Sequence, residues 1–160
     1  MNIENSRMAA WMQPEQILLD VRLRDVQHAL EFIADAIATA HGLEAGSVFR
    51  ALARREQAGS TALGGGLAIP HARIPGIDQP LTLLVRTMPG VNFHAPDGEP
   101  VTLLLAILVP ANGDPEEHLN LLALISQMFS RPAFRAQLEA AADATAAAQV
   151  IHSETEGLAG

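Results

Sequence analysis

The chain has 160 residues, 49% of them hydrophobic, which is enough for one domain with a substantial core. A formal net charge of −8 without a Lys/Arg cluster argues against nucleic-acid binding. The absence of cysteine excludes disulfides, Cys-ligated zinc and thiol catalysis. The Met1 end does not resemble a signal peptide, and the longest apolar run is too short to span a membrane. We therefore expect a soluble, cytoplasmic protein that does not insert into membranes.

Hydrophobic periodicity and turn residues predict the elements of the first half of the chain. Glycine is a typical helix terminator, and proline seldom continues a strand. The predicted elements are, in order, a loose lead-in at 1–13, an edge strand at 17–19, a helix at 24–40 ended by Gly42, a helix at 44–57, a glycine-rich break and a short strand at 67–69 before Pro70.

The second half contains two almost continuous apolar runs, 81–85 and 101–109, which are typical of strands covered on both faces. Turn residues at 88–90 and 96–98 separate them. Helices are then predicted from Pro115 behind an Asp114 N-cap, at 133–142, and at 144–152 behind an Asp143 N-cap. The buried stripe of the first is expected at Leu119, Leu122, Ile125 and Phe129. The order predicts a three-layer α/β/α fold, a mixed sheet with helices on both faces, covering 14–153 before a tail at 154–160.

The segment 54–73 combines a basic pair, two hydroxyls, three glycines and a histidine. Neutral imidazole, with an ordinary pKa near 6.5, can attack phosphorus and pass the phosphoryl group on. Backbone N–H groups of Gly64, Gly65 and Gly66 and the hydroxyls of Ser60 and Thr61 are candidates to bind its oxygens. Pro70 restricts the backbone before His71, which favours a fixed position at a strand end. The segment therefore predicts a phosphohistidine at His71, although a flexible glycine turn beside an ordinary histidine is the plainer interpretation.

His118 is the second histidine of interest, because it lies in the first turns of a predicted helix, where negative charge is favoured. It could donate a hydrogen bond to a phosphoryl oxygen there, but the residues alone favour a solvated surface histidine. The glycines do not form a nucleotide-binding Walker A loop, because no Gly-Lys-Ser/Thr follows them. We expect no cofactor.

Two separated blocks resemble the type-2 EIIA domains of the bacterial phosphoenolpyruvate-dependent phosphotransferase system, the fructose/mannitol class. The first runs from Arg55-Glu56 through Gly59-Ser60-Thr61 to Gly64-Gly65-Gly66-Leu67-Ala68-Ile69-Pro70-His71. The second contains Leu105-Ala106-Ile107-Leu108-Val109-Pro110 and then His118-Leu119. The resemblance implies that His71 accepts a phosphoryl group from a phosphocarrier protein, that His118 stabilises it, and that Arg55 helps to hold it. It also implies a mixed sheet between helices.

The lack of a transporter segment and the polar end of the chain resemble the nitrogen-related EIIA proteins. This resemblance implies an HPr-like phosphocarrier of the nitrogen branch as donor, and targets such as kinases or potassium transport proteins. One alternative is a stand-alone EIIA component of a fructose/mannitol transporter that passes phosphate to EIIB. Another is a metal-dependent hydrolase that uses His71, His94 and His118, although no metal-ligand spacing supports it and we expect no metal.

Overall fold

The computed structural model describes residues 12–159. The chain divides into two compact units, Asp20–Asn112 and Met1–Leu19 together with Gly113–Gly160. Residues 1–11 of the predicted lead-in lie outside the described residues, whereas Met12 is buried. A short 3-10 helix, η1 (Pro14–Gln16), follows Gln13.

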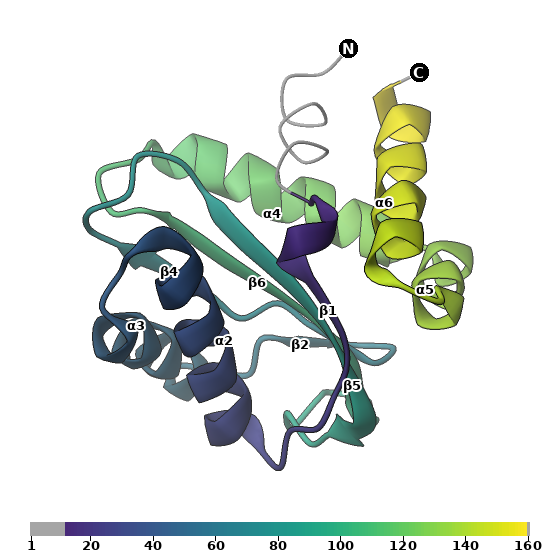
Figure 1. Ribbon diagram of the computed structural model, residues 1–160, viewed down its shortest axis with the longest axis horizontal. Coiled ribbons are helices and arrows are strands. Elements are labelled where there is room, and N and C mark those ends of the chain that lie inside the picture. Colours follow the sequence, from purple (N-terminus) through teal and green to yellow (C-terminus); the bar gives the residue numbers. More distant parts are fainter. Residues whose placement is uncertain (1–11, 160) are drawn as a thin grey trace. The chain divides into compact units, whose positions relative to one another are not determined.

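Within residues 12–159 the sheet has six strands, and Figure 1 shows its long strands β5 and β6. They are β1 (Ile17–Val21), β2 (Ala62–Gly64), β3 (Leu67–Ala68), β4 (His71–Ile74), β5 (Leu81–Val91) and β6 (Val101–Pro110). The strand order is β1-β5-β6-β3-β2, and β4 pairs with β6 beyond β3. β5 is antiparallel to β6, whereas β3 and β4 are parallel to it. The predicted mixed sheet, with 17–19 in an edge strand, is confirmed.

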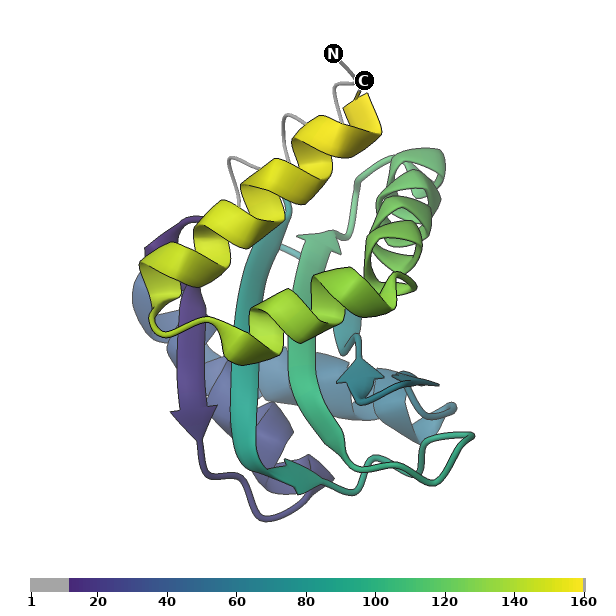
Figure 2. The ribbon, with the colours of Figure 1, turned by 90° about the vertical axis from the view of Figure 1, so that its right-hand side faces the viewer.

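β6 forms the centre of the hydrophobic core. Every residue from Leu103 to Val109 is buried, and since successive strand residues point to opposite faces, both faces of β6 are covered. This pattern explains the continuous apolar run in the sequence. Figure 2 shows β5 and β6 side by side, with α2 and α3 behind them.

Helices α2 (Val26–His41) and α3 (Ala45–Gln57) belong to the unit Asp20–Asn112 and pack against each other. The Asp25 carboxylate caps α2 by accepting a hydrogen bond from the His28 backbone N–H. Gly42 ends the helix in the left-handed conformation, with φ of 67°. Both predicted helices are confirmed.

The other unit contains α4 (Pro115–Phe129), α5 (Pro132–Ala140) and α6 (Ala144–Ala159). The Asp114 and Asp143 carboxylates accept hydrogen bonds from the first turns of α4 and α6, as their predicted roles as N-caps require. α6 continues past the predicted end at His152, so the predicted tail is helical as far as Ala159.

Two local predictions are wrong. The expected turn at 88–90 lies inside β5, in a stretch where the register with β6 is irregular between Arg86 and Val91. Strands accept proline and glycine at such irregular positions. The α4 stripe is also shifted, because Leu119 is 64% exposed while Leu121 is buried with Ile125, Met128 and Phe129.

Candidate functional site

The end of α3 and the loop after it build one side of the site. Arg55 and Glu56 occupy the last turn of α3. The Glu56 carboxylate accepts two hydrogen bonds from Thr61, one from its backbone N–H at 2.9 Å and one from its hydroxyl at 2.6 Å. Thr61 is only 4% exposed, so the carboxylate satisfies two donors that have little access to water. Glu56 thereby fixes the loop against the helix.

Thr61 in turn fixes the strand segment that leads to His71. Its carbonyl oxygen accepts a hydrogen bond from the Ile69 N–H at 3.0 Å. Pro70 follows, and its carbonyl accepts a hydrogen bond from the Ile107 N–H of β6 at 2.9 Å. His71 is the first residue of β4 and lies opposite Ile107 in the parallel ladder. The histidine is therefore placed by the central strand at the beginning of a strand, rather than by a loose loop.

The two ring nitrogens of His71 make contacts of opposite kinds. Nδ1 lies 2.8 Å from the Ile69 carbonyl oxygen, and because a carbonyl can only accept, Nδ1 carries the proton. The Arg55 Nε–H donates to Nε2 at 3.2 Å, so Nε2 is the acceptor. Together these contacts assign the neutral tautomer with its proton on Nδ1. Arg55 itself is anchored by a hydrogen bond from Nη1 to the Gly59 carbonyl oxygen at 2.9 Å.

The surroundings lower the pKa of His71 below its ordinary value near 6.5. Burial of the half-buried ring is the largest cause, and the positive charge of Arg55 acts in the same direction. The Ile69 carbonyl and the negative charge of Glu56 oppose them. The imidazole is thus predominantly neutral at pH 7, as a nucleophile must be.

The three glycines form the turn between β2 and β3 and do not reach His71. Gly66 lies beside Leu103 and Thr102 at the start of β6, whereas His71 lies beside Ile107. The two positions on β6, Leu103 and Ile107, are four residues apart, which corresponds to about 13 Å at about 3.3 Å per residue. The Gly65 N–H donates to the Asp97 carboxylate at 2.8 Å, which helps to hold the pKa of Asp97 below its usual range. We therefore leave Gly64, Gly65 and Gly66 out of the phosphate site.

Backbone geometry explains this glycine run. Gly64, Gly65 and Gly66 have φ of 91°, 66° and 83°, so three consecutive residues adopt conformations that side chains disfavour. A carboxylate at this turn would also repel an anion.

The hydroxyls of Ser60 and Thr61 are both engaged in structural hydrogen bonds. Ser60 Oγ donates to the Phe93 carbonyl oxygen and accepts from the Ala62 N–H, while the Thr61 hydroxyl donates to Glu56. These contacts close the loop after α3. A phosphoryl group would have to break them to use either hydroxyl, so we assign both residues to loop structure.

Two other histidines were singled out in the sequence, His118 and His94. His118 is in the first turn of α4, half-buried, and belongs to the other unit, so its part in the site stays a prediction. His94 is exposed in the loop between β5 and β6. Between residues 12 and 159, no three or more His, Asp or Glu side chains are grouped so that they could hold a metal ion, and the hydrolase alternative gains no support. In the same part of the chain, no helix has the length and apolar character needed to cross a membrane.

Two groups that organise the site were given no role from the sequence. One is the backbone carbonyl of Ile69, which no side-chain pattern could identify. The other is Glu56, for which a signal existed. An acidic residue in the last turn of a helix opposes the helix dipole, so its carboxylate is more favourable there when it has other hydrogen-bond donors.

The family model for the phosphoenolpyruvate-dependent sugar phosphotransferase system, EIIA 2, matches residues 10–154. The chain belongs to this family. It is 36% identical over 146 residues to a nitrogen regulatory protein of Pseudomonas aeruginosa, covering 91% of this chain and 94% of the relative. A fructose-specific EIIA component of Haloferax volcanii is 34% identical over 111 residues, covering 69% of this chain and 71% of the relative.

Solved structures agree with this assignment. The crystal structure of the nitrogen regulatory protein IIA-Ntr from Neisseria meningitidis superimposes with a TM-score of 0.85 at 32% identity, covering 91% of this chain and 99% of that one. The EIIA fold is thereby established, and the protein is a phosphoryl-transfer component of the phosphotransferase system.

Proposed function

We propose that His71 is the phosphoryl acceptor and that it reacts through Nε2. The observation that carries this proposal is the pair of contacts on the ring, with the Ile69 carbonyl at Nδ1 and the Arg55 guanidinium at Nε2. The Nε2 lone pair forms the new bond to phosphorus while the bond between phosphorus and the donor atom breaks, and the electron pair of that bond leaves with the donor. The Nδ1 proton stays hydrogen-bonded to Ile69 throughout.

Arg55 serves the phosphoryl group as well as the ring. Its guanidinium lies at Nε2, next to the position that the phosphoryl group would take, and a cation there stabilises the negative charge of the equatorial oxygens. The phosphoryl group would take over the contact that Nε2 now makes with Arg55. His118 is proposed as a second support for the phosphoryl oxygens, on the resemblance of its helix to that of the family. The domain is proposed to span 14–153.

We propose further that the protein acts in the nitrogen branch, where its phosphorylation state controls the binding of partner proteins. The extensive similarity to the nitrogen regulatory proteins supports this role over that of a fructose/mannitol transporter component, because the similarity to the fructose-specific relative covers less of the chain. The donor would be an HPr-like phosphocarrier of that branch, and candidate targets are kinases and potassium transport proteins.

Intact-mass spectrometry tests the proposal. The protein is incubated with phosphoenolpyruvate and either the general or the nitrogen-branch phosphotransfer proteins, next to His71→Ala, His118→Ala and the control His94→Ala. We expect one acid-labile phosphoryl adduct in the parent protein and in His94→Ala, none in His71→Ala, and faster loading by the nitrogen-branch donor. An adduct that persists in His71→Ala would contradict the proposed acceptor. Faster loading by the general donor would favour sugar transport.

A further inference from the structure

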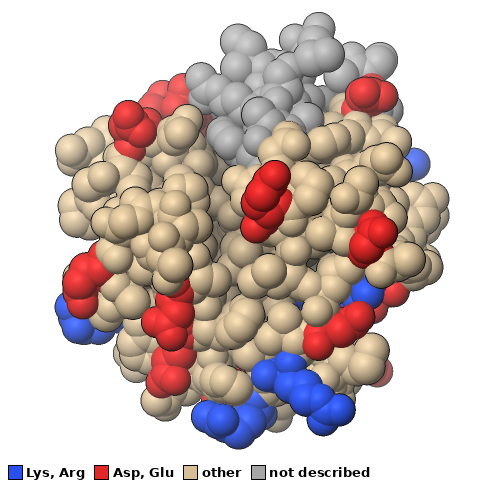
Figure 3. Space-filling model, in the orientation of Figure 1, with Lys and Arg blue, Asp and Glu red and all other residues tan. Residues whose placement is uncertain are grey.

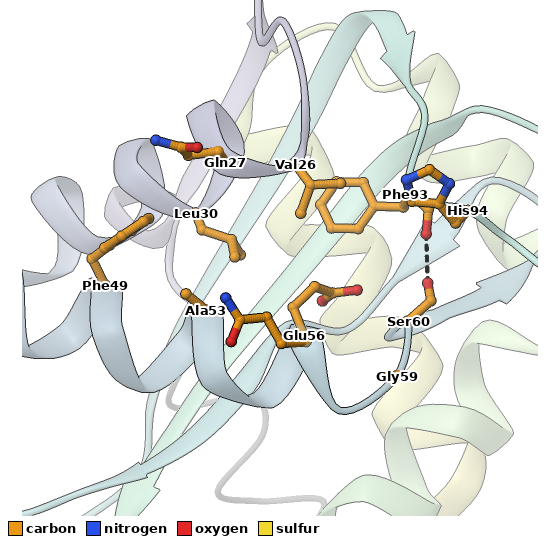
Figure 4. Close-up of a pocket in the computed structure, with 11 residues that line it drawn as sticks. Val26, Gln27, Leu30, Phe49, Ala53, Glu56, Gly59, Ser60, Phe93 and His94 are labelled. Atoms are coloured by element: carbon orange, nitrogen blue, oxygen red, sulfur yellow. Dashed lines mark hydrogen bonds between the residues drawn. The ribbon is translucent and has the colours of Figure 1, made fainter.

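A pocket whose lining does not include His71 lies entirely within the unit Asp20–Asn112. It has a volume of about 690 Å³ and is lined by α2, α3, the loop at Gly59 and Ser60, and the segment at Phe93 and His94. This size falls within the range of about 300–1,000 Å³ that is usual for small-molecule sites. Figure 4 shows its walls.

The lining combines apolar and polar side chains (Figure 4). Val26 of α2 and Phe49 and Ala53 of α3 supply partly exposed apolar surface, and the buried Leu30 and Phe93 pack behind it. Such surface suits an alkyl or aryl group of a ligand. The side-chain amides of Gln27 and Gln57, which also line the pocket, can donate and accept hydrogen bonds.

The charged side chains of the lining indicate which charge a ligand should carry. The lining includes the Glu56 carboxylate and neither lysine nor arginine, so the pocket favours a cation over an anion. Thr61 uses two hydrogen-bonding positions of this carboxylate, and a carboxylate offers about four. Glu56 can therefore also accept a bond from a ligand ammonium group.

The pocket is joined to His71 by a short series of hydrogen bonds. Glu56, in the pocket wall, binds Thr61; the Thr61 carbonyl binds the Ile69 N–H; and the Ile69 carbonyl binds His71 Nδ1. A second connection runs from Gly59, also in the wall, to Arg55. A ligand that shifts the Glu56 charge or the Gly59 loop would act on both groups that contact the imidazole.

We propose that this pocket binds a small organic amine with an alkyl or aryl body, and that its occupancy changes the reactivity of His71. The binding claim stands by itself, whereas the effect on phosphoryl transfer rests on the proposed function.

Binding is tested with three probes of similar size and different charge: 2-phenylethylamine, 2-phenylethanol and phenylacetate. Each is titrated into the ¹⁵N-labelled protein and followed by NMR. We expect saturable shifts at Glu56, Gly59, Ser60 and Phe93, with the amine binding at least ten-fold more tightly than the alcohol and the acid more weakly still. Equal affinity for the three probes, or no saturation with the amine, would overturn the proposal.

Two matched substitutions on α3 locate the site. Ala53→Met fills the pocket wall, whereas Ala51→Met adds the same side chain to the same helix at a position that does not line the pocket. The amine affinity should fall at least ten-fold in Ala53→Met and stay unchanged in Ala51→Met. Comparable melting temperatures establish that both variants are folded. Undiminished binding by a folded Ala53→Met would place the amine elsewhere and refute the site.

The coupling has a readout that needs no phosphoryl donor. Glu56 raises the pKa of His71, so a cation bound beside Glu56 should lower that pKa further. An imidazole NMR titration with saturating amine should show this decrease in the parent protein and not in Ala53→Met. Binding without any change at His71 would refute the coupling. Failure of phosphorylation with intact amine binding would count against the proposed function alone.

Discussion

At the scale of single residues, the site depends on two unlike contacts to one imidazole. A carbonyl at Nδ1 fixes the proton there, and a guanidinium at Nε2 disfavours a second proton because an imidazolium beside it would bring two positive charges together. In the proposed transfer, the same guanidinium would attract the dianionic phosphoryl group as it approaches. Arg55 would thus keep the imidazole neutral before transfer and stabilise the charge of the phosphoryl group afterwards.

Arg55→Ala should raise the pKa of His71 and slow its phosphorylation. Removing the guanidinium removes a positive charge and exposes the ring, and both changes favour the imidazolium. Phosphoryl acceptance should fall on the order of 100-fold, as for the loss of one transition-state donor. Imidazole ¹⁵N NMR and intact-mass kinetics measure the two effects. The control Arg54→Ala removes a charge from an exposed side chain in the same turn of α3 and should leave both values near those of the parent.

The pH dependence of phosphoryl loading follows from the lowered pKa of His71. Only the neutral imidazole attacks, so the loading rate should be constant above about pH 6.5 and should fall as the pH drops through the lowered pKa of His71. In Arg55→Ala the fall should begin at a higher pH. A parent profile whose midpoint lies above pH 6.5 would be incompatible with a buried imidazole next to Arg55.

Glu56→Gln should lower the pKa of His71, in contrast to the change at Arg55. The substitution removes a negative charge that favours the imidazolium, while the amide oxygen can still accept one hydrogen bond from Thr61. Loss of one charge-assisted bond to a buried group should cost about 1–2 kcal/mol in the free energy of unfolding. Imidazole NMR and urea denaturation test the two parts, with the exposed Glu99→Gln as control. A rise in the pKa of His71 would contradict the charge argument.

At the scale of elements, the β2–β3 turn needs residues that adopt positive φ angles, and its three glycines do so without strain. Gly66→Ala should destabilise the fold by about 1–2 kcal/mol, because the residue has φ of 83° and a Cβ there would lie 3.2 Å from Thr102 Oγ1. Gly65→Asn should cost less, since φ of 66° lies in the left-handed region that asparagine tolerates. Urea denaturation compares the two variants. Equal stabilities would indicate that the turn changes its conformation to accept the side chains. A loss of phosphorylation in a folded Gly65→Asn would indicate that the turn does take part in the phosphate site.

The sequence was sufficient to predict the elements whose signals are local. The apolar run of β6 and the N-caps Asp114 and Asp143 lie where residue type alone decides the structure. The short strands β2 and β4 were missed because three or four residues show no periodicity and are defined by their partners. The strand at Val101–Val109 was predicted correctly because its apolar run is long and both of its faces are covered.

The sequence singles out the residue proposed to react, but not the contacts that support it. The Ile-Pro-His motif points to His71, but the bond between Ser60 and Phe93 joins residues 33 apart in sequence, and only the folded chain brings them together. The glycines were interpreted as a phosphate cradle because N–H groups in a glycine run can serve either an anion or a turn. The register with β6 favours the turn.

At the scale of the whole molecule, charge is the property that phosphorylation changes most. The chain has a net charge of −8, and Figure 3 shows acidic side chains scattered over the visible surface, with basic side chains mainly at its lower edge. A phosphoryl group adds about two further negative charges at one half-buried position. Partners that approach this position should therefore sense the two states mainly by local repulsion or attraction, within about 10 Å at moderate salt.

The substitutions His71→Asp and His71→Ala should separate these states in binding to the phosphorylated form of the phosphocarrier. Aspartate places a permanent negative charge beside Arg55, in the position where the donor must present its own phosphoryl group, whereas alanine leaves the Arg55 charge available to that group. We expect the phosphorylated carrier to bind His71→Ala at least five-fold more tightly than His71→Asp at low salt. The ratio should shrink as added salt screens the charges. Isothermal titration calorimetry at two salt concentrations measures both effects, and the unphosphorylated carrier serves as control because it lacks the opposing charge. Equal affinities of the two variants for the phosphorylated carrier would mean that the donor does not present its phosphoryl group at residue 71, and the relay would then require another acceptor.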